Sequence, residues 1–485
     1  MRIKWILIVL TLFLSCSQIP LNAHADKAAP IKLRGVVEGF YGTPWTHQDR
    51  LDMLAFMASK GMNAYIYAPK DDEYHRKYWR QPYPAEKYGE IAELVGKAAE
   101  LHIEFIFAVS PGNDIAFTGP MQQADRVTML DKMEAMYRIG IRRFALFFDD
   151  IPTADAKGQA AFVNWINKEF VHAKGDCKPL ILVPTEYYLR QMAPEGKASD
   201  YTAELAKGID KDIMVLYTGE EVCPDGLTRK TIETTNKLYG KPLGIWWNYP
   251  VSDYLKEKLA LGPVSDMDRS INSNDIAAFF INPMEKPKLS QIAIATGADY
   301  ALNPADYDED KAWHKAIKEQ YGPLSEEMEL FAVHSQRMEN SWAHIGRQDA
   351  PELRLLYKKL WEIMSGQDNF VKRALLDKLL AENRIRDNAI HTLMGDLPRK
   401  NLDECRLQLV QLQKMTEAER YALLLLKEKK TSAEKDPMYR CFKDLKTQIE
   451  ADEASVKISE EATGKFLRDF DEWYLKHMGD INKDV

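Results

Sequence analysis

The chain has 485 residues, of which 45% are hydrophobic and 28% are charged, a balance typical of folded globular proteins. At roughly 150 residues per domain, this length predicts about two to four domains. The 65 basic and 73 acidic side chains give a net charge of −8. The sequence therefore lacks the basic excess with which nucleic-acid-binding proteins neutralise phosphates, and a neutral or polar partner is expected.

The N-terminus has the features of an export signal. Arg2 and Lys4 precede the apolar run Trp5–Leu14, which is too short to span a bilayer, since that takes about 20 helical residues. Cleavage before Cys16 would follow a bacterial lipobox and attach a lipid anchor, whereas the Ala-His-Ala sequence at 23–25 fits ordinary cleavage. We favour the lipobox because it abuts the apolar run. Residues 1–25 are thus expected to be signal and linker, and the protein to be exported to the bacterial envelope, periplasm or exterior.

The remaining cysteines give no sign of a metal site. They are Cys177, Cys223, Cys405 and Cys441. Their spacing is wide and irregular, with no Cys-x-x-Cys pair and no neighbouring histidines, so neither a metal nor another cofactor is expected. Whether any of them form a disulfide stays open.

From residue 31 onward, short apolar or aromatic runs alternate with helical stretches such as 50–60, 92–100 and 128–139, a pattern typical of βα units. The predicted strands are Leu33–Glu38, Asn63–Tyr67, Glu104–Val109, Phe144–Phe148, Leu180–Val183, Ile213–Tyr217, Leu243–Trp247 and Ala277–Ile281. The set fits in about 270 residues, the usual size of a (β/α)8 TIM barrel. We therefore predict an α/β barrel over residues 31–308. A doubly wound sheet is the alternative, but the first βα turn lacks the Gly-x-Gly-x-x-Gly phosphate loop.

The segments that follow these strands are rich in polar and aromatic residues. They are Gly39–Gly42, Ala68–Asp72, Ser110–Asp114, Asp149–Ile151, Pro184–Tyr187, Thr218–Glu220, Asn248–Pro250 and Asn282–Met284. Each alone has an ordinary explanation, since Gly and Pro mark turns and Asp often caps the next helix. Together they would converge on the mouth of a barrel, where TIM-barrel active sites are built.

Two adjacent carboxylates, Asp149 and Asp150, follow a strand that should be buried. Ionising both costs Coulomb repulsion, so one can hold a proton to donate while the other stays charged. Glycoside hydrolysis needs this division of labour. A metal site is the weaker alternative, because Lys70 would repel a cation.

Aromatic residues are expected near the same mouth. They are Tyr41, Trp45, Tyr187, Trp246 and Trp247. Each alone could belong to the core, but together flat apolar faces beside amides and carboxylates suit the C–H faces and hydroxyl edges of a pyranose.

Beyond about residue 310 the strand pattern stops and long helical patterns take over. The predicted helices are Leu353–Met364, Val371–Ile390, Leu402–Lys429 and Ala454–Tyr474. We expect a C-terminal helical bundle over residues 309–485, with the run Leu423–Leu426 buried on more than one side. Packing within the bundle is the simpler use of these apolar faces, and a homodimer formed through the bundle is the second hypothesis.

Several motifs resemble glycoside hydrolase family 84, the family of O-GlcNAcases and bacterial β-N-acetylglucosaminidases. They are residues 34–42 (RGVVEGFYG) with Pro44-Trp45, 67–72 (YAPKDD), 110–115 (SPGNDI), 147–151 (FFDDI), 184–187 (PTEY), 246–248 (WWN) with Asp253-Tyr254, and 282–285 (NPME). The resemblance covers about residues 31–305 and implies a retaining exo-acting enzyme. In this family the 2-acetamido oxygen of the substrate is the nucleophile and an oxazoline is the intermediate.

The resemblance also implies a role for each matching residue. Asp149 would orient and polarise the acetamido N–H, and Asp150 would protonate the leaving oxygen and then activate water. Tyr187 would bond the acetamido oxygen, with Thr218 and Trp246 around the methyl group. Tyr41 would pack near the anomeric centre, while sugar hydroxyls would be held by Gly39, Lys70, Asn248, Asp253 and Asn282. One departure is Val183, where several relatives have a cysteine; we expect altered inhibitor fit with the chemistry intact.

The implied partners are β-GlcNAc-terminated glycans or glycoproteins, with contact to a membrane only through the lipid anchor. Two other functions remain open: a hexosaminidase that degrades hyaluronan, and a surface glycan-binding protein on a barrel without activity. Retention of both Asp149 and Asp150 favours an enzyme, because binding alone needs no proton donor.

Overall fold

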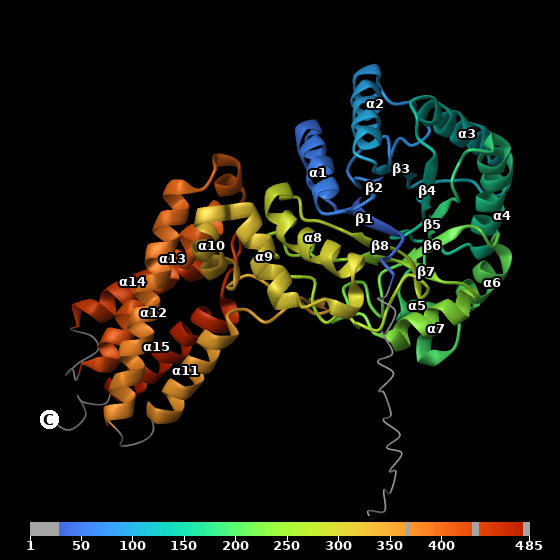
Figure 1. Ribbon diagram of the computed structural model, residues 1–485. Coiled ribbons are helices and arrows are strands. Elements are labelled where there is room, and N and C mark those ends of the chain that lie inside the picture. The colour runs from blue at the N-terminus through green and yellow to red at the C-terminus, as the bar shows by residue number, and fades with distance from the viewer. Residues whose placement is uncertain (1–28, 365–368, 429–435, 479–485) are drawn as a thin grey trace, which may run out of the picture.

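The computed structural model describes residues 29–364, 369–428 and 436–478. The predicted export signal with Cys16 lies outside the described residues, so the signal and the lipid anchor stay predictions. The described chain forms two bodies that pack against each other, a barrel and a group of long helices (Figure 1).

Eight parallel strands close into a barrel in chain order, which confirms the predicted fold class. They are β1 (Leu33–Glu38), β2 (Ala64–Tyr67), β3 (Glu104–Val109), β4 (Arg143–Phe147), β5 (Ile181–Val183), β6 (Met214–Tyr217), β7 (Leu243–Trp247) and β8 (Ile276–Ile281). Closure is made by β1, which pairs with β8 so that Leu33 lies opposite Ala278. Three of the predicted strands match the observed bounds, and the others differ by a single residue at one or both ends.

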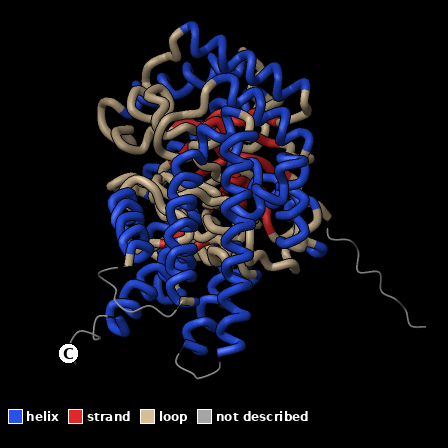
Figure 2. The backbone as a smooth tube through the Cα atoms, turned by 90° about the vertical axis from the view of Figure 1, so that its left-hand side faces the viewer, coloured by secondary structure: helices blue, strands red, loops and turns tan. Residues whose placement is uncertain are grey.

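Alternate side chains of each strand point inward and outward, as the pleat requires. Val37, Ile66 and Phe147 belong to the apolar cluster inside the barrel, whereas Val36 and Tyr65 belong to the larger cluster between strands and helices. Both faces of the sheet are therefore buried, and Figure 2 shows the strands enclosed by helices. This explains why the strands read as continuous apolar runs.

Helices follow most strands. They are α1 (His47–Ser59), α2 (Ala85–Glu100), α3 (Gln122–Arg138), α4 (Ala156–Ile166), α5 (Leu189–Met192), α6 (Asp200–Gly208), α7 (Arg229–Tyr239) and α8 (Pro287–Leu302). α1 begins earlier than predicted because Thr46 and Asp49 form a capping box at its start. The connection from β7 to β8 has no helix, and residues 248–275 form a long loop there.

The region after the barrel is mainly helical, as predicted. Its elements are α9 (Glu309–Tyr321), α10 (Ser325–Ala332), the two-stranded hairpin β9 (Met338–Glu339) and β10 (His344–Ile345), α11 (Pro351–Met364), α12 (Asn369–Asp396), α13 (Arg399–Lys427), α14 (Pro437–Asp452) and α15 (Lys465–Met478). In the run that was expected to be buried on more than one side, Leu423, Leu425 and Leu426 are buried in α13.

The prediction of one helix over Ala454–Tyr474 is wrong. Residues 453–458 are not helical, a π-helical turn follows at Glu460–Gly464, and α15 starts only at Lys465. The break is at Ser459, a buried residue with a φ of 54° whose side chain accepts from Thr463 N and lies 2.8 Å from His334 Nδ1. A tertiary contact thus overrides the local helical pattern. Helix α14 and the hairpin were not predicted.

Polar contacts join the helical region to the barrel. The carboxylate of Glu404 on α13 accepts the backbone N–H groups of Lys288 (3.1 Å) and Leu289 (2.8 Å) in the first turn of α8. It therefore satisfies helix N–H groups that have no partner within their own helix. Burial raises the pKa of Glu404 to about 7. Lys400 pairs with Asp49 on α1 beside this contact.

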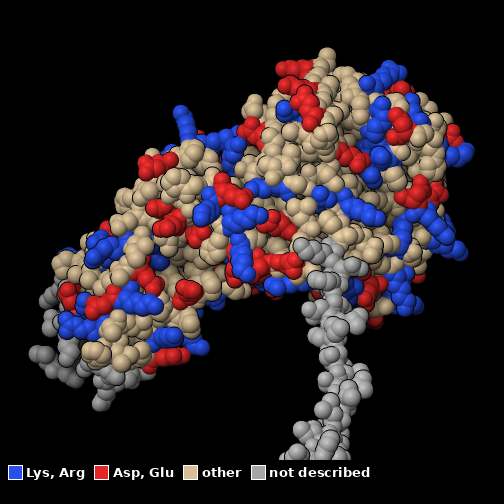
Figure 3. All heavy atoms as spheres, viewed as in Figure 1, with Lys and Arg blue, Asp and Glu red and all other residues tan. Residues whose placement is uncertain are grey.

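The surface carries both charges. Lys and Arg are interspersed with Asp and Glu over the face shown in Figure 3. Within the described ranges, no helix is both long and apolar enough to cross a bilayer. The same residues contain no group of three or more His, Cys, Asp or Glu side chains placed to hold a metal ion.

Candidate active site

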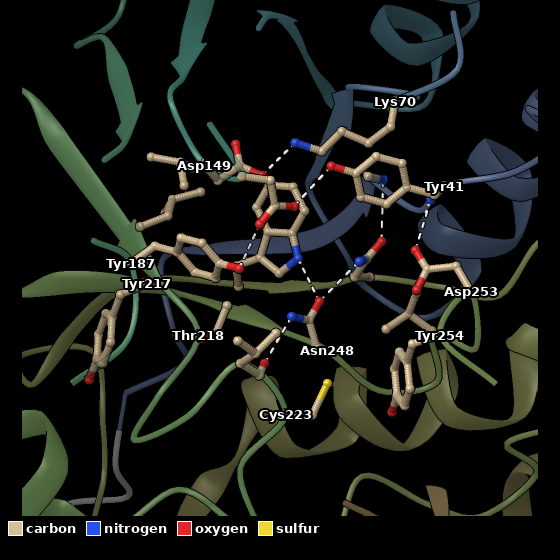
Figure 4. Close-up of a pocket in the computed structure, with 18 of the residues that line it drawn as sticks. Tyr41, Lys70, Asp149, Tyr187, Tyr217, Thr218, Cys223, Asn248, Asp253 and Tyr254 are labelled. Atoms are coloured by element: carbon tan, nitrogen blue, oxygen red, sulfur yellow. Dashed lines mark hydrogen bonds and ion pairs between the residues drawn. The ribbon is translucent and has the colours of Figure 1, made fainter. Parts of the chain in front are cut away.

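A cavity of about 470 Å³ opens at the carboxyl ends of the barrel strands. Every site residue predicted from the sequence lines it, namely Gly39, Tyr41, Lys70, Asp149, Asp150, Tyr187, Thr218, Trp246, Asn248, Asp253 and Asn282. Trp246 lies at the end of β7, and the others come from the segments that follow seven of the eight strands, all except β3. Figure 4 shows Tyr41, Lys70, Asp149, Tyr187, Thr218, Asn248 and Asp253 around one space. Val183, the position of the expected departure, lines it as well.

Asp149 is the buried member of the carboxylate pair. Its side chain is 9% exposed, and Oδ2 pairs with the ammonium of Lys70. That ammonium lies 5.8–5.9 Å from the ring centres of Tyr41, Phe147 and Trp246, so cation–π attraction helps to hold it. Among the described residues, no donor reaches Asp149 Oδ1. This buried oxygen is an acceptor ready for an N–H group from a ligand, because an unsatisfied buried acceptor is costly.

Asp150 is exposed and has different partners. Its backbone φ is 55°, uncommon for a residue other than glycine, and its carboxylate accepts hydrogen bonds from two phenols. Tyr41 Oη donates to Oδ2 and Tyr187 Oη to Oδ1, each over 2.9 Å. Burial, together with the nearby carboxylates, raises the pKa of both tyrosines, so they remain protonated donors. Arg76 stacks over Tyr41 with its Cζ 5.3 Å from the ring centre.

The floor of the cavity is a chain of amide and indole hydrogen bonds. Asn248 Oδ1 accepts from Trp246 Nε1 (2.8 Å) and from Asn282 Nδ2 (3.0 Å). Asn282 Oδ1 in turn accepts from Gly39 N over 3.2 Å. Gly39 is required by close packing, since a Cβ there would lie 2.3 Å from the Trp246 ring. These bonds fix both asparagines and the indole before any ligand arrives.

Asp253 and Thr218 complete the predicted set. Asp253 Oδ2 accepts the backbone N–H of Tyr41 over 2.8 Å, and burial raises the pKa of the Asp253 carboxyl. Thr218 is buried and donates its hydroxyl to Glu221 O over 2.7 Å, and it lines the cavity together with Val183. The cavity is thus lined by both polar side chains, such as Asp253, and apolar ones, such as Val183.

Two aromatic predictions are wrong. Trp247 does not line the cavity but packs against Phe279 in the outer core, because neighbouring residues of a strand point to opposite faces and Trp246 takes the inward one. Trp45 is buried behind β1, and its indole donates to Met284 O. The loop Ser110–Asp114 also stays away from the cavity: Ser110 lies against His75, and Asp114 pairs with Arg80.

The sequence analysis missed part of the wall. The additional lining residues include Val222, Cys223, Val251, Tyr254, Lys256 and Trp342. Burial raises the pKa of the Cys223 thiol to about 12, so the thiol is neutral. The length of the β7–β8 connection was a usable signal, since long loops in compact domains are often functional. Trp342 belongs to the hairpin after the barrel, and nothing in its local sequence indicates this position.

The two carboxylates are therefore equipped for different tasks. Asp149 is buried, paired with a cation and has one oxygen without a partner, whereas Asp150 is exposed at the mouth and can exchange its phenol partners for a ligand. Aromatic faces beside amides suit a pyranose ring. This arrangement fits a reaction in which one carboxylate orients a ligand N–H and the other transfers a proton.

Comparison with known proteins gives a consistent assignment. A family model described as beta-N-acetylglucosaminidase matches residues 34–333, and one described as hyaluronidase post-catalytic domain-like matches residues 352–467. The curated relatives include protein O-GlcNAcase from Rattus norvegicus and from Mus musculus, each 35% identical over 238 residues. This match covers 48% of the chain but only 26% of each relative, so the chain spans about a quarter of their length.

Solved structures match over nearly the whole chain. The structure of CpGH84B superposes with a TM-score of 0.84 at 35% identity and covers 91% of this chain and 77% of its own. A variant of the Thermobaculum terrenum O-GlcNAc hydrolase gives a TM-score of 0.80 at 26% identity, covering 93% of this chain and 96% of its own. The likeness includes the helical region as well as the barrel.

Proposed function

The chain belongs to glycoside hydrolase family 84, and from this premise we propose that it is a retaining exo-β-N-acetylglucosaminidase that removes terminal β-linked GlcNAc, including O-GlcNAc. The observation that carries the proposal is Asp149 Oδ1, a buried carboxylate oxygen without a donor in a cavity of sugar-binding character. An acetamido N–H supplies the missing hydrogen bond. A neutral sugar without this group would leave the oxygen unsatisfied.

The proposed reaction uses the substrate's own acetamido group. Asp149 accepts the acetamido N–H, which increases the negative charge on the acetamido oxygen. That oxygen attacks the anomeric carbon, the bond to the leaving oxygen breaks, and Asp150 protonates the leaving oxygen. As the ring closes, the N–H proton passes to Asp149, so the products of this step are a neutral oxazoline and the free aglycone; Asp149 returns the proton to the nitrogen when the oxazoline opens. Water then opens the oxazoline while Asp150 takes a proton from it, so the anomeric configuration is retained.

The tyrosines must change partners in this scheme. Tyr187 Oη donates to Asp150 in the free protein, and in the proposed complex it donates to the acetamido oxygen, with Thr218 and Trp246 around the methyl group. Tyr41 Oη also leaves Asp150 and packs near the anomeric carbon. Substrate binding thereby frees Asp150 to meet the leaving oxygen. Because both phenols are already aimed into the cavity, the exchange needs only short movements.

The remaining polar groups would hold the sugar hydroxyls. Asn248, Asn282 and Asp253 are fixed by bonds to neighbouring protein groups, so little ordering is required when a sugar binds. Lys70 can contribute as well, because an ammonium has three donors and only one is directed at Asp149. Gly39 contributes backbone only.

Release of 4-nitrophenol from its β-GlcNAc glycoside tests the proposal most simply. We expect turnover by the purified protein, with no release from the matching β-glucoside, since glucose lacks the acetamido group. An absence of turnover between pH 5 and 8 would favour the glycan-binding alternative. Size analysis of hyaluronan digests tests the hyaluronan-degrading alternative. An endo-acting enzyme shortens the polymer, whereas an exo-acting one leaves its length nearly unchanged.

A further inference from the structure

The long loop between β7 and β8, which carries Asp253 and Tyr254 into the cavity, is held by a segment from outside the barrel. This segment, residues 335–349, lies between α10 and α11 and contains the hairpin β9–β10; we call it the bracing segment. Leu261 N donates to Ser335 O over 2.7 Å, and Ser335 Oγ donates to Leu259 O over 2.6 Å. Both segments are largely irregular, so bonds of this kind set their relative position.

Asp349 is the centre of this contact. Its side chain is 3% exposed, and Oδ1 accepts the backbone N–H groups of Gln336 (2.6 Å) and Arg337 (2.9 Å). Oδ2 accepts from Lys258 Nζ over 2.7 Å, and Lys258 is itself 7% exposed and lies 3.5 Å from Glu460. One carboxylate therefore joins the start of the hairpin to the active-site loop. Loss of one partner in such a buried pair leaves an uncompensated charge.

The tip of the hairpin reaches the cavity. Trp342 lines it, with its ring centre 4.9 Å from that of Tyr254. The other side of the hairpin is bonded to the loop after β6, through His344 N to Cys223 O at 3.4 Å. In Figure 4, Cys223 and Tyr254 lie below Asn248, whereas Lys70 and Asp149 lie above it. We call Cys223, Tyr254 and Trp342 the Trp342 wall.

We propose that Asp349 is a positioning residue of the active site, which sets the position of the Trp342 wall by holding the bracing segment against the β7–β8 loop. It touches no substrate. Since the hydrogen bonds of Asp349 reach neither Asp149 nor Asp150, its loss should weaken substrate binding and leave the chemical step nearly intact. The inference rests on the proposed function, because the wall belongs to the same cavity. If Asp349 has this role, the helical region after the barrel contributes to substrate binding.

Kinetics of Asp349→Asn and Lys258→Met test the proposal. On 4-nitrophenyl β-GlcNAc we expect KM to rise about 3- to 30-fold, with kcat within about threefold of the parent. The matched control is Glu419→Gln, which alters a buried ion pair with Arg386 between α12 and α13. The control should lower the melting temperature without changing KM. Equal losses in kcat, or the same rise in KM for the control, would overturn the positioning role.

A double-mutant cycle identifies the path of the effect. If Asp349 acts through the wall, Asp349→Asn should raise KM by less than about twofold in a Trp342→Ala background, since residues in one network are not additive. A rise of the same factor in both backgrounds would show that Asp349 does not act through Trp342. If Asp349→Asn does not fold, Lys258→Met serves in its place.

A measurement without turnover separates this inference from the proposed function. In the ¹⁹F spectrum of protein labelled with 5-fluorotryptophan, the Trp342 signal is assigned by its loss in Trp342→Phe. It should shift or broaden in Asp349→Asn and stay in place in Glu419→Gln. An inactive protein whose Trp342 signal moves would refute only the proposed function. An active protein with an unmoved signal and unchanged KM would refute only the positioning role.

Discussion

Replacement of Asp149 by alanine is expected to lower kcat/KM by a factor on the order of 10²–10⁴ on substrates with good and poor leaving groups alike. The variant loses the acceptor for the acetamido N–H, so attack by the acetamido oxygen is impaired whatever departs from the anomeric carbon. It also leaves Lys70 buried without its carboxylate partner. The measurement compares a dinitrophenyl glycoside with an alkyl or Ser-linked GlcNAc.

Asp149→Asn serves as the matched control for shape. Asparagine can still accept the acetamido N–H through its amide oxygen but carries no charge beside Lys70. We expect a smaller loss than in Asp149→Ala and again no dependence on the leaving group. A loss in Asp149→Ala that appears only with poor leaving groups would contradict the role assigned to this residue.

Replacement of Asp150 by alanine should give a loss that depends on the leaving group. A dinitrophenolate needs no proton to depart, so its release should be nearly unaffected, whereas an alkyl or Ser-linked oxygen is strongly basic and should lose a factor on the order of 10²–10⁴. Both rates are measured on one protein preparation. Their ratio is therefore independent of the enzyme concentration and of the fraction of the protein that is folded.

Added azide should rescue only the Asp150→Ala variant. An anionic nucleophile opens the oxazoline without a general base, and attack on the face opposite the ring nitrogen and oxygen gives the β-azide. Rescue of Asp149→Ala instead would show that Asp149 is the general acid and base and that Asp150 orients the acetamido group. Formation of the α-azide by Asp150→Ala would exclude an oxazoline intermediate.

The barrel was predictable because the parallel strands are buried on both faces. Runs such as Glu104–Val109 and Leu243–Trp247 are nearly all apolar, and their spacing follows from the helices between them. Residues that follow the strands gather at the barrel mouth, so adjacency to a strand end was enough to find Asn282 and Asp149, although it also pointed to Ser110–Asp114, which does not line the cavity. Where a choice depended on side-chain direction, as for Trp246 and Trp247, the pattern alone could not decide.

Contacts between distant segments were not predictable. At the break in the helical pattern, Ser459 contacts His334. The bracing segment, which contains Trp342, is joined to the β7–β8 loop by Asp349 and Lys258, which lie 91 residues apart in the chain. Nor does the sequence show that Tyr41 and Tyr187 both donate to Asp150 in the free protein. Such partners are fixed by tertiary packing, which local patterns do not encode.

The nucleophilic role of the substrate's acetamido oxygen is tested most directly by a series of 4-nitrophenyl β-glycosides whose N-acyl group carries zero, one, two or three fluorines. Each fluorine withdraws electron density from the acetamido oxygen and makes it a poorer nucleophile, while KM reports separately on the fit of the larger group. We predict that kcat falls steeply with each fluorine, by several orders of magnitude across the series. A kcat that stays constant from the acetyl to the trifluoroacetyl substrate would show that the acetamido oxygen is not the nucleophile.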